Sequence, residues 1–155
     1  MSRVQLALRV ADLDDAVDFY SKLFATPPAK RRPGYANFAV TEPPLKLVLL
    51  EGEPGEETHL DHLGVEVGTT DEVAAAASRL ALTGLATDVQ DSTTCCYAVQ
   101  DKVWVTAPGG EPWEIYTVLA DDRPDLEGIT GPAPSAVRGD GVCCATNADG
   151  NAACC

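Results

Sequence analysis

Two adjacent cysteines, Cys95 and Cys96, have the clearest capacity for chemistry in this sequence. Neighbouring Cα atoms lie about 3.8 Å apart, less than the roughly 4.4–6.8 Å that a relaxed disulfide spans, so both thiols are expected to stay free. Soft sulfur ligands select soft metals and metalloids, and two adjacent thiolates can hold one such centre between them. The alternative is that both are small buried hydrophobic residues, because free cysteine is often interior.

Three further polar residues, Gln5, His62 and Glu114, occur at matching places in two similar halves of the chain. Taken singly, each is better explained as a hydrogen-bonded structural side chain, but their matching placement favours a shared cation. An imidazole, a carboxylate and an amide resemble a two-histidine, one-carboxylate triad in which Gln5 replaces one histidine and coordination positions stay open for dioxygen and water. The fourth matching position is Lys46, which cannot be a ligand while protonated. His59 is not counted among the candidate ligands, because it lies three residues from His62 and would face the opposite side of a regular strand.

The elements that must position these residues form two similar series. The first series is a strand over 3–10, a helix that starts at the N-cap Asp12 and ends before Pro27-Pro28, and three short strands. These strands are predicted at 29–32, 35–41 and 45–51, separated by turn residues.

The second series starts near residue 60. Leu60–Val67 is predicted to be a strand, and the capping box from Thr69 to Glu72 begins a helix that ends at Gly84. Further strands are predicted around 86–90, 95–100, 102–107 and 112–118. Gln5 then matches His62, and Lys46 matches Glu114. The expected fold class is α+β, with two βαβββ modules at about 2–52 and 59–119.

Composition narrows the function classes. The chain has 155 residues, a formal charge of -13 at pH 7 and a pI near 4.3, which argues against a nucleic-acid or anionic-membrane partner. It shows neither a membrane-spanning apolar run nor a signal peptide. One domain is expected over 1–119, followed by a disordered acidic tail over 120–155. All six cysteines form adjacent pairs, including Cys143-Cys144 and Cys154-Cys155, so we expect reduced thiols in a cytoplasmic monomer or homodimer.

Three segments resemble the vicinal oxygen chelate superfamily: the opening strand over 3–10, Asp61–Val67 and Trp113–Tyr116. More narrowly, four other segments resemble the carbon-arsenic lyases of organoarsenical resistance and the cadmium-induced proteins. These segments are Pro33–Phe38, Pro44–Leu50, Thr93–Cys96 and Gln100–Val105. The resemblance extends from residue 2 to about 120, and it implies a vicinal oxygen chelate fold in which the paired modules form a curled mixed sheet around a metal.

The resemblance implies a non-haem iron(II) dioxygenase that cleaves the carbon-arsenic bond of trivalent organoarsenicals and releases arsenite, for arsenic resistance. By position, Gln5, His62 and Glu114 would bind Fe(II), and Cys95 and Cys96 would bind arsenic. Dioxygen would be the co-substrate. The family often has histidine at the position of Gln5, so weaker iron binding is expected. Methylarsenite and aromatic arsenicals both stay open as substrates.

Two other functions fit the same residues. A non-enzymatic protein would use the adjacent thiols to sequester cadmium or arsenite without iron. A lactoylglutathione enzyme of the same superfamily is disfavoured, because Lys46 stands where such enzymes commonly place a fourth metal ligand. Arsenite release from methylarsenite by Fe(II)-loaded protein separates an enzyme from a metal-binding protein.

Overall fold

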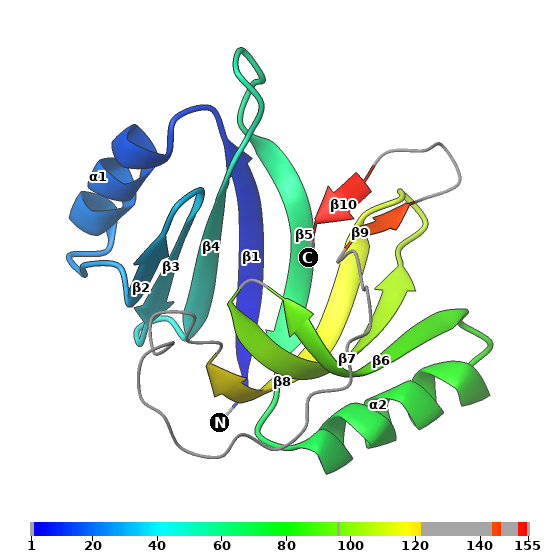
Figure 1. Cartoon of the computed structure of the whole chain (residues 1–155). Coiled ribbons are helices and arrows are strands. Elements are labelled where there is room, and N and C mark those ends of the chain that lie inside the picture. The colour runs from blue at the N-terminus through cyan, green and yellow to red at the C-terminus, as the bar shows by residue number, and fades with distance from the viewer. Residues whose placement is uncertain (1, 96, 122–143, 147–151, 155) are drawn as a thin grey trace, which may run out of the picture.

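A curved eight-stranded mixed sheet with two helices on its outer side is the main feature of the structure (Figure 1). The structure is a computed structural model and describes residues 2–95, 97–121, 144–146 and 152–154. The first half contains β1 (Arg3–Val10), α1 (Leu13–Leu23), β2 (Lys30–Arg32), β3 (Tyr35–Val40) and β4 (Leu45–Glu51). The second half contains β5 (His59–Glu66), α2 (Thr70–Leu82), β6 (Thr87–Cys95), β7 (Ala98–Thr106) and β8 (Pro112–Asp121). The predicted α+β fold is confirmed.

The two halves join at the centre of the sheet, whose strand order is β2-β3-β4-β1-β5-β8-β7-β6. The first strands of the halves, β1 and β5, pair antiparallel with each other. Each also pairs in parallel with the last strand of its own half, β1 with β4 and β5 with β8. The four matching positions found in the sequence therefore lie on the four adjacent central strands.

Alternation along the strands separates an apolar outer face from an inner face that carries the polar residues. Leu47 and Leu49 of β4 pack with Leu13 and Val17 of α1, and Val103 of β7 packs against α2. Because successive side chains of a strand point to opposite faces, the residues between them face inward. The helices thus bury the outer face, and the inner face holds polar residues beside a smaller apolar cluster of Ala7, Tyr35, Val48 and Leu50.

Both helices start at the predicted caps. The side chain of Asp12 accepts a hydrogen bond from the backbone N–H of Asp15 at 2.9 Å, and Thr69 accepts one from Glu72 at 3.2 Å. Such caps satisfy backbone donors that the first helical turn leaves unpaired. Neither described helix has the length and apolar character needed to cross a membrane.

The predicted division of 86–107 into three strands is wrong. The structure has two strands there: β6 ends at Cys95, and β7 continues without a break through Gln100, Asp101 and Lys102. These three polar residues are buried in the sheet rather than placed in a turn, and the partners of Asp101 and Lys102 come from other elements. The strand predicted over 112–118 is also longer, since β8 reaches Asp121.

The segment predicted to be a disordered tail contains two described strands, β9 (Cys144–Thr146) and β10 (Ala152–Cys154). They pair antiparallel, with Cys154 opposite Cys144. Small residues allow such pairing through backbone hydrogen bonds without a packed core. Cys143 and Cys155 lie outside the described residues, and disorder in the rest of the tail stays a prediction.

Candidate active site

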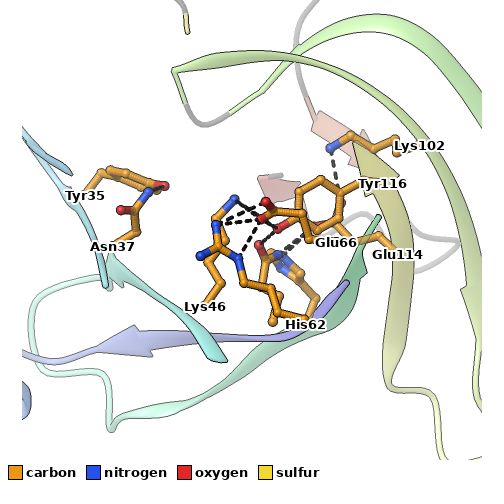
Figure 2. Close-up of polar contacts among 10 residues, drawn as sticks. Tyr35, Asn37, Lys46, His62, Glu66, Lys102, Glu114 and Tyr116 are labelled. Atoms are coloured by element: carbon orange, nitrogen blue, oxygen red, sulfur yellow. Dashed lines mark hydrogen bonds and ion pairs between the residues drawn. The ribbon is translucent and has the colours of Figure 1, made fainter. Parts of the chain in front are cut away.

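The candidate metal ligands lie in one row across the inner face of the sheet. In the strand register, Lys46 is opposite Gln5, Gln5 is opposite Gly64, and Gly64 is opposite Glu114. His62 lies two residues before Gly64 and therefore on the same face. Gln5, His62 and Glu114 are each at most 4% exposed. Figure 2 shows how the side chains around this row converge.

The three side chains meet at hydrogen-bonding distance. Gln5 Nε2 lies 2.6 Å from Glu114 Oε1 and 2.9 Å from His62 Nε2. His62 Nε2 lies 3.4 Å from Glu114 Oε1. The structure therefore brings together the three residues predicted to bind a metal, one each from β1, β5 and β8.

The orientation of His62 is set by its neighbour Asp61. Nδ1 of His62 is 2.6 Å from Asp61 Oδ1, and Arg9 Nε holds the other oxygen of Asp61 at 2.9 Å. In the neutral ring, Nδ1–H donates to Asp61 and leaves the lone pair of Nε2 directed at Gln5 and Glu114. Burial disfavours the charged ring, but hydrogen bonds to Asp61 and Glu114 outweigh it and raise the pKa of His62 to about 9. The surroundings of His62 therefore favour a positive charge, either on the ring itself or on a bound cation.

Glu114 is held as an anion. Burial would raise the pKa of its carboxyl, but the hydrogen bond to His62 and the charges of Lys102 and His62 lower it. Lys102 Nζ lies 3.3 Å from Glu114 Oε2, so the ion pair engages one oxygen while Oε1 faces Gln5 and His62. Trp104 packs edge-on against His62 with ring centroids 5.4 Å apart.

A second polar cluster surrounds the hydroxyl of Tyr116. This hydroxyl lies 2.5 Å from Gln5 Oε1 and 2.9 Å from Glu66 Oε2, and it accepts a hydrogen bond from Lys46 Nζ at 2.9 Å. Lys46 and Arg3 also form ion pairs with Glu66 at 3.3 and 3.1 Å. Lys46 was predicted not to be a ligand, and its ammonium is committed to this cluster. Gln5 joins both clusters, through its nitrogen on one side and its oxygen on the other.

The residues at the row fit a divalent cation if the amide of Gln5 turns over. Rotation would direct Oε1 at His62 and Glu114, and would direct the NH₂ group at Tyr116, whose hydroxyl can accept from it while donating to Glu66. Gly64 provides the space, because an added Cβ there would lie 3.1 Å from Glu114 Cγ and 3.3 Å from Gln5 Cβ. The described residues contain no cluster of three or more His, Cys, Asp or Glu suited to a metal, so a cation held by His62 and Glu114 would need Gln5 to supply its third protein donor.

Cys95, one of the predicted arsenic ligands, is the last residue of β6 and pairs in register with Ala98. Cys96 lies outside the described residues. The first half of the chain holds the start of β7: Lys30 Nζ donates to the carbonyl of Tyr97 at 3.1 Å, and the Tyr97 and Tyr35 rings lie 5.7 Å apart. Tyr97 has a φ of 65°, so the backbone next to the two cysteines is irregular. Adjacent side chains on a regular strand point to opposite faces, so two adjacent thiols can bind one atom only where the backbone is irregular.

A cavity of about 260 Å³ lies beside these clusters. Its lining includes Tyr35 from β3, Lys46 and Glu66 from the Tyr116 cluster, and Ala98 and Gln100 from β7. Gln5, His62 and Glu114 do not line it. The cavity thus extends from the Lys46 side of the row to the hairpin that carries Cys95.

Sequence reasoning missed Asp61, Gly64, Glu66 and Tyr116. Strand parity was a usable signal for three of them, because Gly64 and Glu66 share the parity of His62, and Tyr116 shares that of Glu114. Asp61 directly precedes His62, and neighbouring side chains of a regular strand point to opposite faces. The bulge in β5 at this point breaks that rule and lets the two side chains meet.

Known proteins resemble this chain in sequence. Residues 3–115 match the family model described as "Glyoxalase/Bleomycin resistance protein/Dioxygenase superfamily". A trivalent organoarsenical cleaving enzyme of Thermomonospora curvata is 67% identical over 121 residues, covering 78% of this chain and 80% of the relative. The cadmium-induced protein CadI of Mycobacterium tuberculosis is 63% identical over 123 residues, covering 79% and 80%.

Two solved structures share the fold at low sequence identity. A Mn(II)-bound glyoxalase from Novosphingobium aromaticivorans has a TM-score of 0.58 and 17% identity, covering 78% of this chain and 41% of that one. Homoprotocatechuate 2,3-dioxygenase from Arthrobacter globiformis has a TM-score of 0.56 and 20% identity, covering 76% and 36%.

Proposed function

The chain belongs to the glyoxalase, bleomycin resistance protein and dioxygenase superfamily, and on this premise we propose that it is an Fe(II)-dependent dioxygenase that cleaves the carbon-arsenic bond of trivalent organoarsenicals. The observation that carries the proposal is the buried meeting of Gln5, His62 and Glu114 on the three adjacent strands β1, β5 and β8. The name of the relative from Thermomonospora curvata supports the same substrate class.

The chemistry balances with dioxygen as the co-substrate. Methylarsenite, CH₃As(OH)₂, and one O₂ give formaldehyde and arsenite, As(OH)₃. The carbon-arsenic bond breaks, the methyl carbon loses four electrons to dioxygen, and one oxygen atom enters each product. Fe(II) at the row would supply the activation of dioxygen, which does not react readily with a closed-shell substrate.

The chain's own residues would hold the metal and keep the site dry. His62 Nε2, Glu114 Oε1 and the amide oxygen of Gln5 would be the ligands. Asp61 fixes the His62 tautomer, and Lys102 engages the second oxygen of Glu114. These partners keep the donor atoms in place before the substrate arrives.

Cys95 and Cys96 would hold the substrate. Each thiol displaces one hydroxyl from arsenic, so two arsenic-sulfur bonds form and two water molecules leave. Binding to the protein makes the later encounter with dioxygen effectively intramolecular. The thiolate is the reactive form, so this step should accelerate as pH rises toward the thiol pKa.

A non-enzymatic thiol protein that binds cadmium or arsenite is the second candidate, and the name of the cadmium-induced relative favours it. Such a protein needs the thiols but has no use for the buried Gln5, His62 and Glu114 row. The two functions therefore differ in their dependence on iron.

The test is an arsenic speciation assay on the full chain. Protein loaded with Fe(II) under argon is mixed with methylarsenite, oxygen is admitted, and arsenite and formaldehyde are measured. We expect equal amounts of both products, loss of both in Glu114→Gln and in Cys96→Ser, and normal release in the control His59→Gln, whose exposed ring lies outside the row. Methylarsenite that stays bound and intact in the iron-loaded protein would overturn the proposal and leave the thiol-binding function.

A further inference from the structure

The hydroxyl of Tyr116 has more acceptors beside it than protons to give. Its oxygen lies 2.5 Å from Gln5 Oε1 and 2.9 Å from Glu66 Oε2, and it accepts a hydrogen bond from Lys46 Nζ at 2.9 Å (Figure 2). An amide oxygen and a carboxylate can only accept, and a tyrosine hydroxyl has a single proton. Tyr116 can therefore donate to Gln5 or to Glu66, but not to both at once.

Which acceptor Tyr116 serves is linked to the orientation of the Gln5 amide. In the structure, Nε2 of Gln5 donates to Glu114 Oε1 at 2.6 Å, so Oε1 of Gln5 faces Tyr116 and receives its proton. When the amide turns over, its NH₂ group faces Tyr116 and its oxygen faces the row. The hydroxyl then accepts from Gln5, and its proton is available to Glu66.

Glu66 is the stronger of the two acceptors. Arg3 and Lys46 form ion pairs with it at 3.1 and 3.3 Å and hold it as an anion. Hydrogen bonds to an ionised acceptor are roughly twice as strong as those between neutral groups. Donation from Tyr116 to Glu66 therefore partly offsets the hydrogen bond from Gln5 to Glu114 that is lost when the amide turns. The ion pairs of Glu66 thus favour the orientation of Gln5 that can bind a cation.

No other group of the described chain can replace Tyr116 in this role. Among the described residues, its hydroxyl is the only hydrogen-bond partner of Gln5 Oε1. Tyr116 is 0% exposed and Gln5 is 3% exposed, so bulk water does not reach between them. Without the hydroxyl, the turned amide would leave its buried NH₂ group without this acceptor, which is unfavourable.

We propose that Tyr116 is a positioning residue for the candidate metal centre: by donating to Glu66, it becomes the acceptor for the NH₂ group of Gln5 and so directs the amide oxygen at the cation. The inference rests on the proposed function, because it requires Fe(II) to bind at the row. Tyr116 acts through Gln5 and does not contact the metal. A carboxylate in place of the amide would need no such partner, because its two oxygens are equivalent.

The test is a double-mutant cycle in Fe(II) affinity that combines Tyr116→Phe with Gln5→Glu. Tyr116→Phe removes only the hydroxyl. Gln5→Glu gives a side chain whose two ends are the same, so its orientation no longer decides which atom faces the row. Titrations are made under argon on the full chain. In every protein the four tail cysteines are replaced by serine so that they do not bind iron; these are Cys143, Cys144, Cys154 and Cys155.

Tyr116→Phe should weaken Fe(II) binding about tenfold in the otherwise unchanged parent protein, which corresponds to about 1.4 kcal/mol. In the Gln5→Glu background, the same change should alter the affinity by less than about threefold. The control Tyr20→Phe removes a hydroxyl from a ring that stacks on Phe24 of α1, and it should leave both affinities unchanged. Equal losses from Tyr116→Phe in the two backgrounds would overturn the inference, because a general support of the sheet does not depend on an amide at position 5.

A second variant tests the same role with the hydroxyl in place, should Tyr116→Phe fail to fold by circular dichroism. Glu66→Gln replaces the anion by an amide whose own NH₂ group can donate to Tyr116. Tyr116 would then give its proton to Gln5 and favour the orientation seen in the structure. Fe(II) affinity should fall more in the parent than in the Gln5→Glu background, in which the lost charge of Glu66 acts alone.

The outcomes separate this inference from the proposed function. A parent protein that binds no Fe(II) would overturn the proposed function and the inference with it. A parent that binds Fe(II), with equal effects of Tyr116→Phe or of Glu66→Gln in both backgrounds, would contradict the positioning role alone. Neither result depends on turnover, so a failure of carbon-arsenic cleavage does not imitate a loss of positioning.

Discussion

Gln5 is the residue on which the candidate site depends most closely. Its amide nitrogen donates to Glu114 and lies 2.9 Å from His62 Nε2 on one side, and its oxygen accepts from Tyr116 on the other. An amide has a donor NH₂ group and an acceptor oxygen. The NH₂ group of Gln5 can therefore donate a hydrogen bond within the row, or, after a 180° rotation of the amide, its oxygen can bind a cation there. The hydroxyl of Tyr116 tolerates either orientation because Glu66 and Lys46 remain its partners. We therefore expect metal binding to require no movement of the backbone.

Gly64 is the residue whose replacement should most directly disturb metal binding. In Gly64→Ala the new Cβ would press on Glu114 Cγ at 3.1 Å and on Gln5 Cβ at 3.3 Å, pushing two ligands apart. We expect Fe(II) affinity to fall by about tenfold or more, while the strand itself tolerates alanine. An anaerobic Fe(II) titration measures this. Gly68→Ala is the control, since its Cβ would meet a flexible carboxylate end of Glu72. Equal iron affinity in both variants would show that the cation does not bind at this row.

Asp61 tests whether the orientation of His62 matters for the metal. Asp61→Asn removes the charged acceptor of Nδ1–H and no longer fixes the tautomer that directs the Nε2 lone pair at the site. Fe(II) affinity should fall by about 10- to 100-fold with the fold retained by circular dichroism. Substitution of the exposed His59 by glutamine should leave the titration as it is. A normal titration for Asp61→Asn would contradict the role of His62 as a ligand.

At the residue scale, the sequence allowed the three candidate ligands to be predicted, because each matches a position in the other half of the chain. The supporting residues escaped prediction for a physical reason. Asp61, Lys102 and Tyr116 act through contacts between strands whose register is set by sheet packing. The shape of the site follows from Gly64, whose contribution is the absence of a side chain.

At the element scale, β7 shows why local sequence reading failed. The strands predicted at 95–100 and 102–107 are separated within three consecutive polar residues, Gln100, Asp101 and Lys102. In the structure Gln100 and Lys102 face inward and Asp101 faces outward, and each is buried. In this part of β7 both faces carry polar residues: Gln100 and Lys102 on the inner face and Asp101, which contacts α2, on the outer face. The alternation of apolar and polar residues that predicts a strand is therefore absent here.

Asp101 anchors two elements and predicts a pH dependence. It accepts from the Thr70 hydroxyl at the start of α2 at 2.5 Å and from the backbone N–H of Ser92 in β6 at 2.7 Å. Both hydrogen bonds lower the pKa of Asp101 below its ordinary 3.8. The stability they contribute is present above that value and is lost as pH falls through the lowered pKa.

Asp101→Asn should therefore be less stable than the parent protein at pH 7 by about 1–2 kcal/mol, and the difference should shrink as pH falls below about 3.8. Urea unfolding between pH 3 and 7 measures both values. Asp88→Asn, a change of an exposed carboxylate on β6, provides the control. A difference that stays constant down to pH 3 would mean that the charge of Asp101 contributes nothing.

At the scale of the whole molecule, the two halves have the same architecture and different roles. The matching strands β4 and β8 present Lys46 and Glu114 to the row, and β1 and β5 present Gln5 and His62. Lys46 pairs with Glu66 beside the cavity, whereas Glu114 faces the other candidate ligands. The second half thus supplies two of the three candidate ligands, while both halves line the cavity. The repeat made the common architecture predictable, but the division of roles depends on side chains from both halves.

The end of β8 decides where the catalytic unit can be cut from the tail. Asp121 pairs with Ala98 and Ala120 pairs with Val99, directly after the segment that carries the thiols. A chain cut after Asp121 keeps these pairs, and a chain cut after Leu119 loses them. Both cuts keep Glu114 and remove the four tail cysteines. The two truncations therefore differ only in the support of the hairpin.

We predict that the chain cut after Asp121 releases arsenite from methylarsenite at the rate of the full chain, with normal Fe(II) affinity and fewer arsenic atoms bound at saturation. The chain cut after Leu119 should bind Fe(II) normally but bind methylarsenite several-fold more weakly, because the start of β7 frays without its partner strand. Arsenic stoichiometry, iron titration and amide exchange at Ala98 and Val99 separate these effects. If the longer truncated chain were inactive, residues beyond β8 would have to complete the site. If both truncated chains matched the full chain, the thiol hairpin would be stable without the end of β8, and its support would have to come from the contacts of Tyr97 with β2 and β3.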